Sequence, residues 1–100
     1  MIKVLALLGS ARKNGNSDLL LQSLVKGLTS EGAEVETVRL SKLKINPCLN
    51  CGGCDIDGTC VQKDEMLILF DKLLTYDIIV LASPIYFMSV SSWTKAMIDR

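Results

Sequence analysis

The four cysteines are the residues of this chain whose types and spacing most clearly suggest chemistry. They follow the spacing Cys48-x2-Cys51-x2-Cys54-x5-Cys60. So compact a run is typical of loops in which each thiolate binds one iron of a [4Fe–4S] cluster. Gly52 and Gly53 allow the backbone to fold closely around such a cluster. A structural zinc site and unliganded thiols are the alternatives, whereas disulfides are not expected in a reducing compartment.

A polar stretch between a predicted strand and a predicted helix has the composition of a phosphate-binding loop. Gly9 and Gly15 permit a tight turn and a close approach to a ligand. The side chains suited to phosphate oxygens are Ser10, Arg12, Asn16 and Ser17. The unpaired N–H groups and the dipole at the start of the helix also favour an anion. The alternative is a capping turn, in which Asn16 or Ser17 caps the helix and Arg12 is solvated.

Aromatic side chains lie in a third segment, Ser83-Pro84-Ile85-Tyr86-Phe87-Met88-Ser89. Tyr86 and Phe87 offer flat apolar surfaces for a ring system, beside backbone groups that Pro84 holds in place. Packing in a core or an interface is the commoner role of aromatic residues, and it is the alternative for both. Trp93 is assigned to packing.

Three strands and three helices are predicted to position these segments. The strands are residues 1–8, 34–40 and 77–82, where apolar residues run on or alternate. The helices are residues 17–30, 65–74 and from Trp93 onward, with Gly32, Asp64 and Ser91 or Ser92 as caps. The cysteine-rich loop, residues 47–62, belongs to an irregular segment. The alternation predicts an α/β fold, a flavodoxin-like doubly wound parallel sheet of strand order 2-1-3. The loops after the first and third strands then meet where FMN binds.

Composition restricts the class of protein. Lys and Arg together number 11, as do Asp and Glu, and a net charge of zero argues against nucleic-acid or acidic-membrane partners. No apolar run approaches the length of a membrane span and no signal pattern opens the chain, so a cytoplasmic location is expected. The absence of His excludes a His-containing triad. With three strands, residues 1–100 are expected to be the N-terminal portion of a single FMN-binding domain.

Three motifs in this order resemble the NADPH-dependent FMN reductase family. They are Gly9-Ser10-x-Arg12-x-x-Gly15-Asn16-Ser17, the cysteine run ending in Cys60-Val-Gln-Lys-Asp64-Glu-Met66, and Ser83-Pro84-Ile85-Tyr86-Phe87 followed by Lys95-Ala-Met-Ile98-Asp99-Arg100. The cysteine spacing is similar to that of the iron–sulfur flavoprotein branch of the family. The resemblance implies a flavodoxin-like fold that binds FMN non-covalently, usually in a homodimer or homotetramer.

The resemblance also implies roles for individual residues. The phosphate of FMN would be held by Ser10, Arg12, Asn16 and Ser17 in the loop that contains Gly15. The isoalloxazine would be lined by Pro84, Ile85, Tyr86 and Phe87, with Ser89 nearby. The cluster would be ligated by Cys48, Cys51, Cys54 and Cys60. In that branch the cluster passes electrons from a carrier such as ferredoxin to FMN, which reduces a small acceptor such as a quinone, dioxygen or peroxide.

Together these features predict a flavin-dependent oxidoreductase in which the cofactors carry the chemistry, with no side chain acting as a catalytic acid or base. A cluster-free enzyme that uses NAD(P)H to reduce FMN or a quinone is the first alternative. A zinc-binding or thiol-switch module without a catalytic flavin is the second. A segment that folds only together with further chain is the third.

Overall fold

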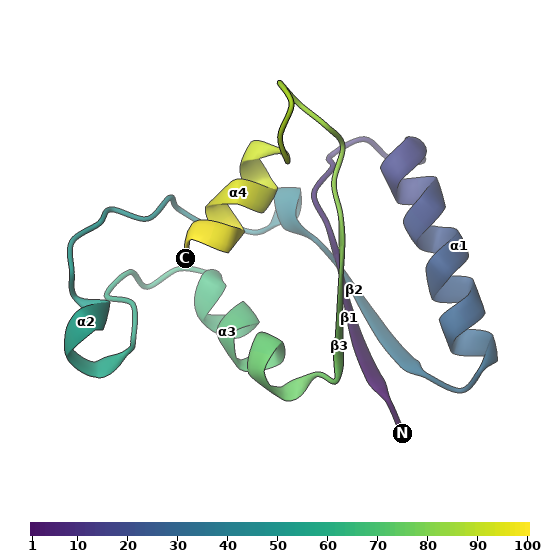
Figure 1. Cartoon of the computed structure of the whole chain (residues 1–100), viewed down its shortest axis with the longest axis horizontal. Helices are drawn as coiled ribbons and strands as arrows, with labels where there is room; N and C mark the ends of the chain where they lie inside the picture. The colour runs from purple at the N-terminus through teal and green to yellow at the C-terminus, as the bar shows by residue number, and fades with distance from the viewer.

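A three-stranded parallel sheet with helices on both faces forms the centre of the computed structural model, which describes all 100 residues (Figure 1). The strands are β1 (Lys3–Leu8), β2 (Glu34–Arg39) and β3 (Ile78–Ala82), in the order β2-β1-β3. This confirms the predicted flavodoxin-like strand order. The register pairs Leu8 of β1 with both Arg39 and Ala82, so the carboxyl ends of the three strands meet at one edge.

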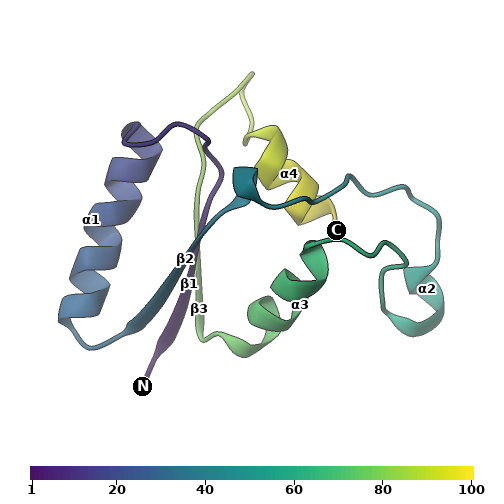
Figure 2. The ribbon, with the colours of Figure 1, turned by 180° about the vertical axis from the view of Figure 1, so that it is seen from behind.

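Three longer helices cover the sheet, and they form two layers around it. Helix α1 (Asn16–Ser30) lies on one face, while α3 (Met66–Thr75) and α4 (Ser92–Asp99) lie on the other (Figures 1 and 2). None of the helices is long and apolar enough to cross a membrane. The predicted helix bounds differ from the observed ones by at most one residue, and the end of α1 at Ser30 was predicted correctly.

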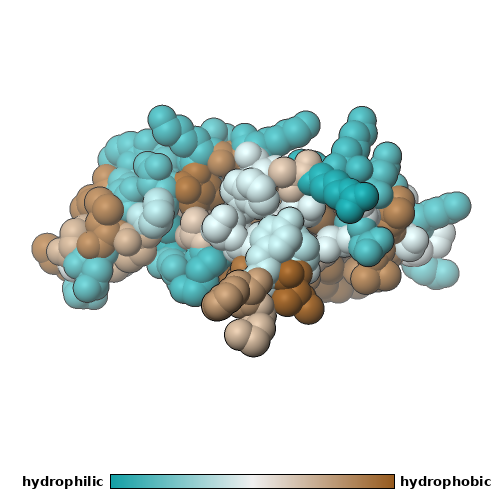
Figure 3. Space-filling model, turned by 90° about the horizontal axis from the view of Figure 1, so that it is seen from above, coloured by the Kyte–Doolittle hydropathy of each residue, from teal (hydrophilic) through white to brown (hydrophobic).

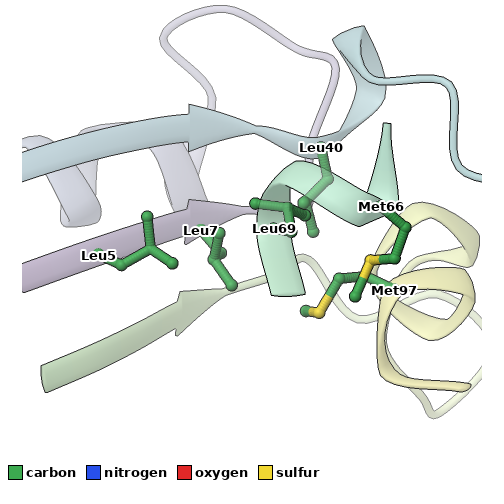
Figure 4. Close-up of a cluster of buried hydrophobic side chains, with 6 residues drawn as sticks. All are labelled: Leu5, Leu7, Leu40, Met66, Leu69 and Met97. Atoms are coloured by element: carbon green, nitrogen blue, oxygen red, sulfur yellow. The ribbon is translucent and has the colours of Figure 1, made fainter. Parts of the chain in front are cut away.

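The core divides between the two faces because side chains of a strand alternate. Leu5 and Leu7 of β1 pack with Met66 and Leu69 of α3 and with Met97 of α4, as Figure 4 shows. On the opposite face, Ala6 and Leu8 pack with Leu21 of α1. The unbroken apolar run of β1 is therefore required, since both of its faces are buried.

The segment between β2 and α3 projects away from the sheet (Figures 1 and 2). It contains a 3-10 turn at Leu40–Lys42 and a short helix, α2 (Cys54–Asp57), that the sequence does not predict. Gly58 ends α2 in a left-handed conformation with φ of 78°, and its N–H donates to the carbonyl of Cys54 over 2.8 Å. The segment remains irregular elsewhere, as predicted.

An edge of the sheet is left open, as expected for three strands. Strand β3 has no neighbour on its outer side, and Ile78, Ile79 and Leu81 are all partly exposed. A buried parallel strand needs cover on both faces. The apolar side chains of β3 therefore remain available for further protein surface.

Candidate functional site

The loops that follow β1 and β3 lie side by side, as the strand order predicts. The N–H of Gly9 donates to the carbonyl of Ala82 over 2.7 Å. Gly9 also packs against the buried start of α4, where a Cβ on Gly9 would lie 1.9 Å from Oγ1 of Thr94. Only glycine allows this approach. Ser91, one of the two residues predicted to cap α4, accepts a hydrogen bond from the N–H of Thr94 over 3.3 Å and is fully buried.

The phosphate loop, defined as residues 9–17, leaves the start of α1 free. The N-cap of α1 is Gly15, and no side chain caps the helix. The alternative in which Asn16 or Ser17 caps it is therefore wrong. The guanidinium of Arg12 is exposed and makes no hydrogen bond or ion pair, while the Ser10 hydroxyl accepts from the N–H of Arg12 over 3.2 Å. Free helical N–H groups beside an unpaired guanidinium fit the phosphate of FMN.

The phosphate loop is held in place by a charged pair, Arg39 and Asp18, that the sequence does not predict. The guanidinium of Arg39 donates to the carbonyl of Ser10 over 2.8 Å and to the carboxylate of Asp18 over 2.9 Å. The same Asp18 oxygen accepts the N–H of Asn14 over 2.9 Å. Hydrogen bonds from Gln22, Asn14 and Arg39 lower the pKa of Asp18 to about 2. No local sequence pattern identifies Arg39 as the partner of Asp18, because Arg39 lies in β2, 21 residues further along the chain.

The aromatic loop, defined as residues 83–89, ends in a tight turn. Tyr86 and Ser89 exchange backbone hydrogen bonds of 2.9 and 3.1 Å. Phe87 and Met88, the two central residues, have φ of 47° and 63°. Such values at both central positions are those of a type I′ turn, which glycine or asparagine normally occupies. The turn therefore carries backbone strain.

The tip of the aromatic loop presents both ring surfaces and free backbone donors. Phe87 is 94% exposed, and Ile85 and Tyr86 are exposed as well. The N–H groups of Ile85, Phe87 and Met88 donate to no protein acceptor. In Figure 3, which views the molecule from above, hydrophobic patches interrupt a hydrophilic surface. Apolar surface next to unpaired N–H groups fits a flavin ring, which has an apolar body and polar edge atoms.

A groove joins the aromatic loop to the beginning of the cysteine-rich loop. Its volume is about 560 Å³, and Pro47, Tyr86 and Lys95 are among the residues that line it. Helix α4 forms its floor through Ser92, Ala96 and Asp99. One residue from each of the two segments predicted to bind cofactors, Pro47 and Tyr86, thus lines the same groove.

The four cysteines of the cysteine-rich loop are free thiols. Cys48, Cys51 and Cys54 are exposed, and Cys60 is partly buried. Four free thiols within 13 residues are the donor type that an iron–sulfur cluster needs. Their sulfurs are not gathered, however, since no three Cys, His, Asp or Glu side chains converge on a common point.

A glycine, Gly53, permits the two halves of the cysteine-rich loop to pack closely against each other. A Cβ on Gly53 would lie 2.6 Å from Cγ1 of Val61, so a larger residue would push the halves apart. The amide of Gln62 closes the loop further by donating to the carbonyl of Pro47 over 3.0 Å. The lack of a side chain at Gly53 therefore permits the segment that contains Cys51 and Cys54 to lie against the one that contains Cys60.

The base of the cysteine-rich loop is fixed by Arg100, which the sequence marks only as part of a motif. Its guanidinium donates to both carboxylate oxygens of Asp64 over 2.6 and 3.1 Å and to the carbonyl of Asn46 over 2.9 Å. It also donates to the sulfur of Cys60 over 3.3 Å. The N–H of Gln62 and, to a smaller extent, the guanidinium of Arg100 lower the pKa of the Cys60 thiol.

A parallel sheet of order β2-β1-β3, with the phosphate loop and the aromatic loop at the carboxyl ends of β1 and β3, has the architecture of the flavodoxin-like class of α/β proteins. Within that class, the chain belongs to the NADPH-dependent FMN reductase family, whose sequence profile matches residues 2–100.

Curated relatives agree with this assignment. An iron-sulfur flavoprotein of Archaeoglobus fulgidus is 42% identical over 99 residues, which cover 99% of this chain and 45% of the relative. An iron-sulfur flavoprotein of Methanocaldococcus jannaschii is 35% identical over 99 residues, or 99% of this chain and 51% of the relative. These relatives confirm the resemblance to the iron–sulfur flavoprotein branch. The chain spans about half the length of the curated relatives it matches.

Solved structures share the fold. A flavone reductase superposes with a TM-score of 0.75 at 28% identity, over 99% of this chain and 29% of that protein. An azoreductase from Bacillus anthracis superposes with a TM-score of 0.78 at 17% identity, over 99% of this chain and 54% of that protein. The second similarity, at such low identity, concerns the fold alone.

Proposed function

We propose that residues 1–100 form part of a single FMN-binding domain of a flavin-dependent oxidoreductase. The observation that carries this proposal is the contact between Gly9 and Ala82, which sets the phosphate loop beside the aromatic loop. FMN has a phosphate at one end and an apolar ring at the other, and the two loops match these ends in chemistry. When bound, FMN would supply the electron or hydride transfer.

The phosphate loop would bind the charged end of the cofactor. Arg12 would donate its planar fork to phosphate oxygens, and the hydroxyls and amide of Ser10, Asn16 and Ser17 would add hydrogen bonds. Gly15 would leave the first turn of α1 accessible, because it carries no side chain that competes for the helical N–H groups.

The aromatic loop would bind the ring. Pro84 and Ile85 would hold the backbone in place, while Tyr86 and Phe87 would cover the ring and exclude water from it. Ser89 would act indirectly, since its hydrogen bonds with Tyr86 close the turn that orients the unpaired N–H groups. The chain offers no His and no paired carboxylates here, so we assign no catalytic acid or base.

We further propose that Cys48, Cys51, Cys54 and Cys60 bind a [4Fe–4S] cluster. The spacing, the free state of the thiols and the names of the relatives in Archaeoglobus and Methanocaldococcus support this. The loop would bring the sulfurs together on binding. We also propose that the electron donor is ferredoxin or NAD(P)H and that the acceptor is a small molecule. The protein would act as a homodimer or homotetramer.

An anaerobic absorption spectrum of the protein, before and after dithionite, tests both cofactors. Flavin bands over a broad shoulder that bleaches on reduction, with four irons per chain, are the expected result. A Cys54→Ser variant should lose the iron and keep the flavin bands, whereas Ser23→Ala on the exposed face of α1 should lose neither. A protein that shows no flavin bands after incubation with FMN and removal of unbound FMN would contradict the flavin proposal.

The ungathered sulfurs favour one second candidate, a cluster-free reductase that takes its electrons from NAD(P)H. In that case the spectrum would contain flavin bands without the shoulder, and NADPH would reduce the flavin in iron-free protein. Bound zinc without flavin would instead favour a metal-binding module.

A further inference from the structure

A negative charge, that of Asp18, directly follows the phosphate loop and lies close to the place proposed for an anion. Asp18 is the third residue of α1, and its side chain is only 8% exposed. A carboxylate at this point stabilises the start of the helix but repels a phosphate that binds to the same N–H groups. A positively charged partner for Asp18 therefore favours anion binding at this place.

Arg39 supplies that positive charge and reaches the other end of the loop as well. One guanidinium nitrogen is 2.9 Å from Asp18 Oδ2, and the other donates to the carbonyl of Ser10 over 2.8 Å. Ser10 begins the turn and Asp18 follows its last residue. The planar fork of arginine can make both bonds at once, which lysine cannot.

The pair also holds the most strained residue of the loop. Asn14 has φ of 58°, in the left-handed region, and its N–H donates to the Asp18 oxygen that faces Arg39. Its side-chain oxygen accepts from Gln22 over 3.3 Å. The conformation of Asn14 is thus held by Asp18 and its neighbours, and Asp18 is held by Arg39.

We propose that Arg39, at the carboxyl end of β2, is a positioning residue for the phosphate loop, which it ties together through Ser10 and Asp18 while neutralising the Asp18 carboxylate. The inference rests on the proposed binding of FMN. It separates Arg12, which would contact the phosphate, from Arg39, which acts through the loop.

Titration of the protein with FMN and with riboflavin, which lacks the phosphate, tests this role. Arg39→Met should raise the dissociation constant for FMN roughly tenfold and leave that for riboflavin within about twofold, because only the phosphate meets the uncompensated charge. Adding Asp18→Asn to Arg39→Met should recover part of the FMN affinity. Arg39→Lys should give an intermediate value. Glu36→Gln, which removes an ion pair with Lys72 on the other face of the sheet, is the matched control.

A measurement without ligand guards against variants that fold poorly. Hydrogen exchange at the N–H of Asn14 should be faster in Arg39→Met than in the wild-type protein, with exchange in β1 unchanged. Equal weakening of FMN and riboflavin, or an unchanged preference for FMN, would overturn the role of Arg39 alone. Failure of the wild-type protein to bind FMN would overturn the proposed function and this inference with it.

Discussion

The guanidinium of Arg100 lies 2.6 Å from a carboxylate oxygen of Asp64, and the two side chains are only 1% and 4% exposed. Asp64 also accepts the N–H groups of Asn46 and Met66, so the pair joins both ends of the cysteine-rich loop to the end of α4. Because α4 begins at the aromatic loop, one rigid helix connects the two proposed cofactor segments. Both sites are therefore expected to depend on this pair.

Loss of one partner of this buried pair should destabilise the fold. Arg100→Met would leave the Asp64 carboxylate buried without its charge partner, which should lower the free energy of unfolding by about 3 kcal/mol. Urea denaturation measures the change. Lys95→Met is the control on the same helix, because its pair with Asp99 is largely exposed and should contribute less than about 0.5 kcal/mol. Equal losses in both variants would contradict this account.

Acid should remove the contribution of Asp18 to stability. The pKa of Asp18 is about 2 in the folded protein against an ordinary value of 3.8, so its stabilising effect is complete above pH 3.8 and is lost as the pH falls toward 2. Urea denaturation of the wild type and of Asp18→Asn should therefore differ most near neutral pH and converge near pH 2. A constant difference between the two proteins would exclude an electrostatic role.

Arg12 should contribute to binding of FMN and not to the fold. Its side chain is exposed and bonds to no protein group, so Arg12→Ala should weaken FMN binding by about 1.5–3 kcal/mol without changing the urea midpoint. Fluorescence titration gives the affinity. Lys13→Ala, which removes a neighbouring exposed charge, should have a smaller effect. An unchanged affinity in Arg12→Ala would refute its assignment as a phosphate ligand.

The turn of the aromatic loop should become more stable when its strain is removed. Met88 is exposed and has φ of 63°, so Met88→Gly loses no packing and should raise the free energy of unfolding by about 0.5–1 kcal/mol. Ser89→Gly is the control, since its φ is not positive and glycine there should be destabilising. Destabilisation by Met88→Gly, measured by thermal unfolding, would show that Met88 has contacts that stabilise the loop.

Two glycines should respond to alanine in opposite directions. Gly9→Ala places a methyl group against Thr94 and Ser91 and should cost about 1–3 kcal/mol, and it should separate the phosphate loop from the aromatic loop. Gly27→Ala on α1 meets no neighbouring atom and should stabilise the protein by about 0.5–1 kcal/mol. Unfolding measurements on the two variants, with FMN titration of Gly9→Ala, test the difference.

Hydrophobic patterning accounts for the parts of the fold that were correctly predicted. The unbroken apolar run of β1 and the helical stripe of α1 are local features, and the alternation of strands with helices leaves few ways to arrange a parallel sheet. The short helix α2 was missed because its four residues are too few for a periodic pattern. The N-cap at Gly15 was missed because Asn16 and Ser17 are both stronger capping residues by type.

The sequence by itself determined which residues have side chains suited to a phosphate, a flat ring or iron, because that suitability belongs to side-chain chemistry and to spacing within one loop. Only the tertiary structure decided what supports them. Arg39 meets Asp18 across 21 residues and Arg100 meets Asp64 across 36, and neither charge has a local pattern that reveals its partner. Such pairs form where strands and helices pack, since burial makes an unpaired charge costly and long-range packing selects the partner.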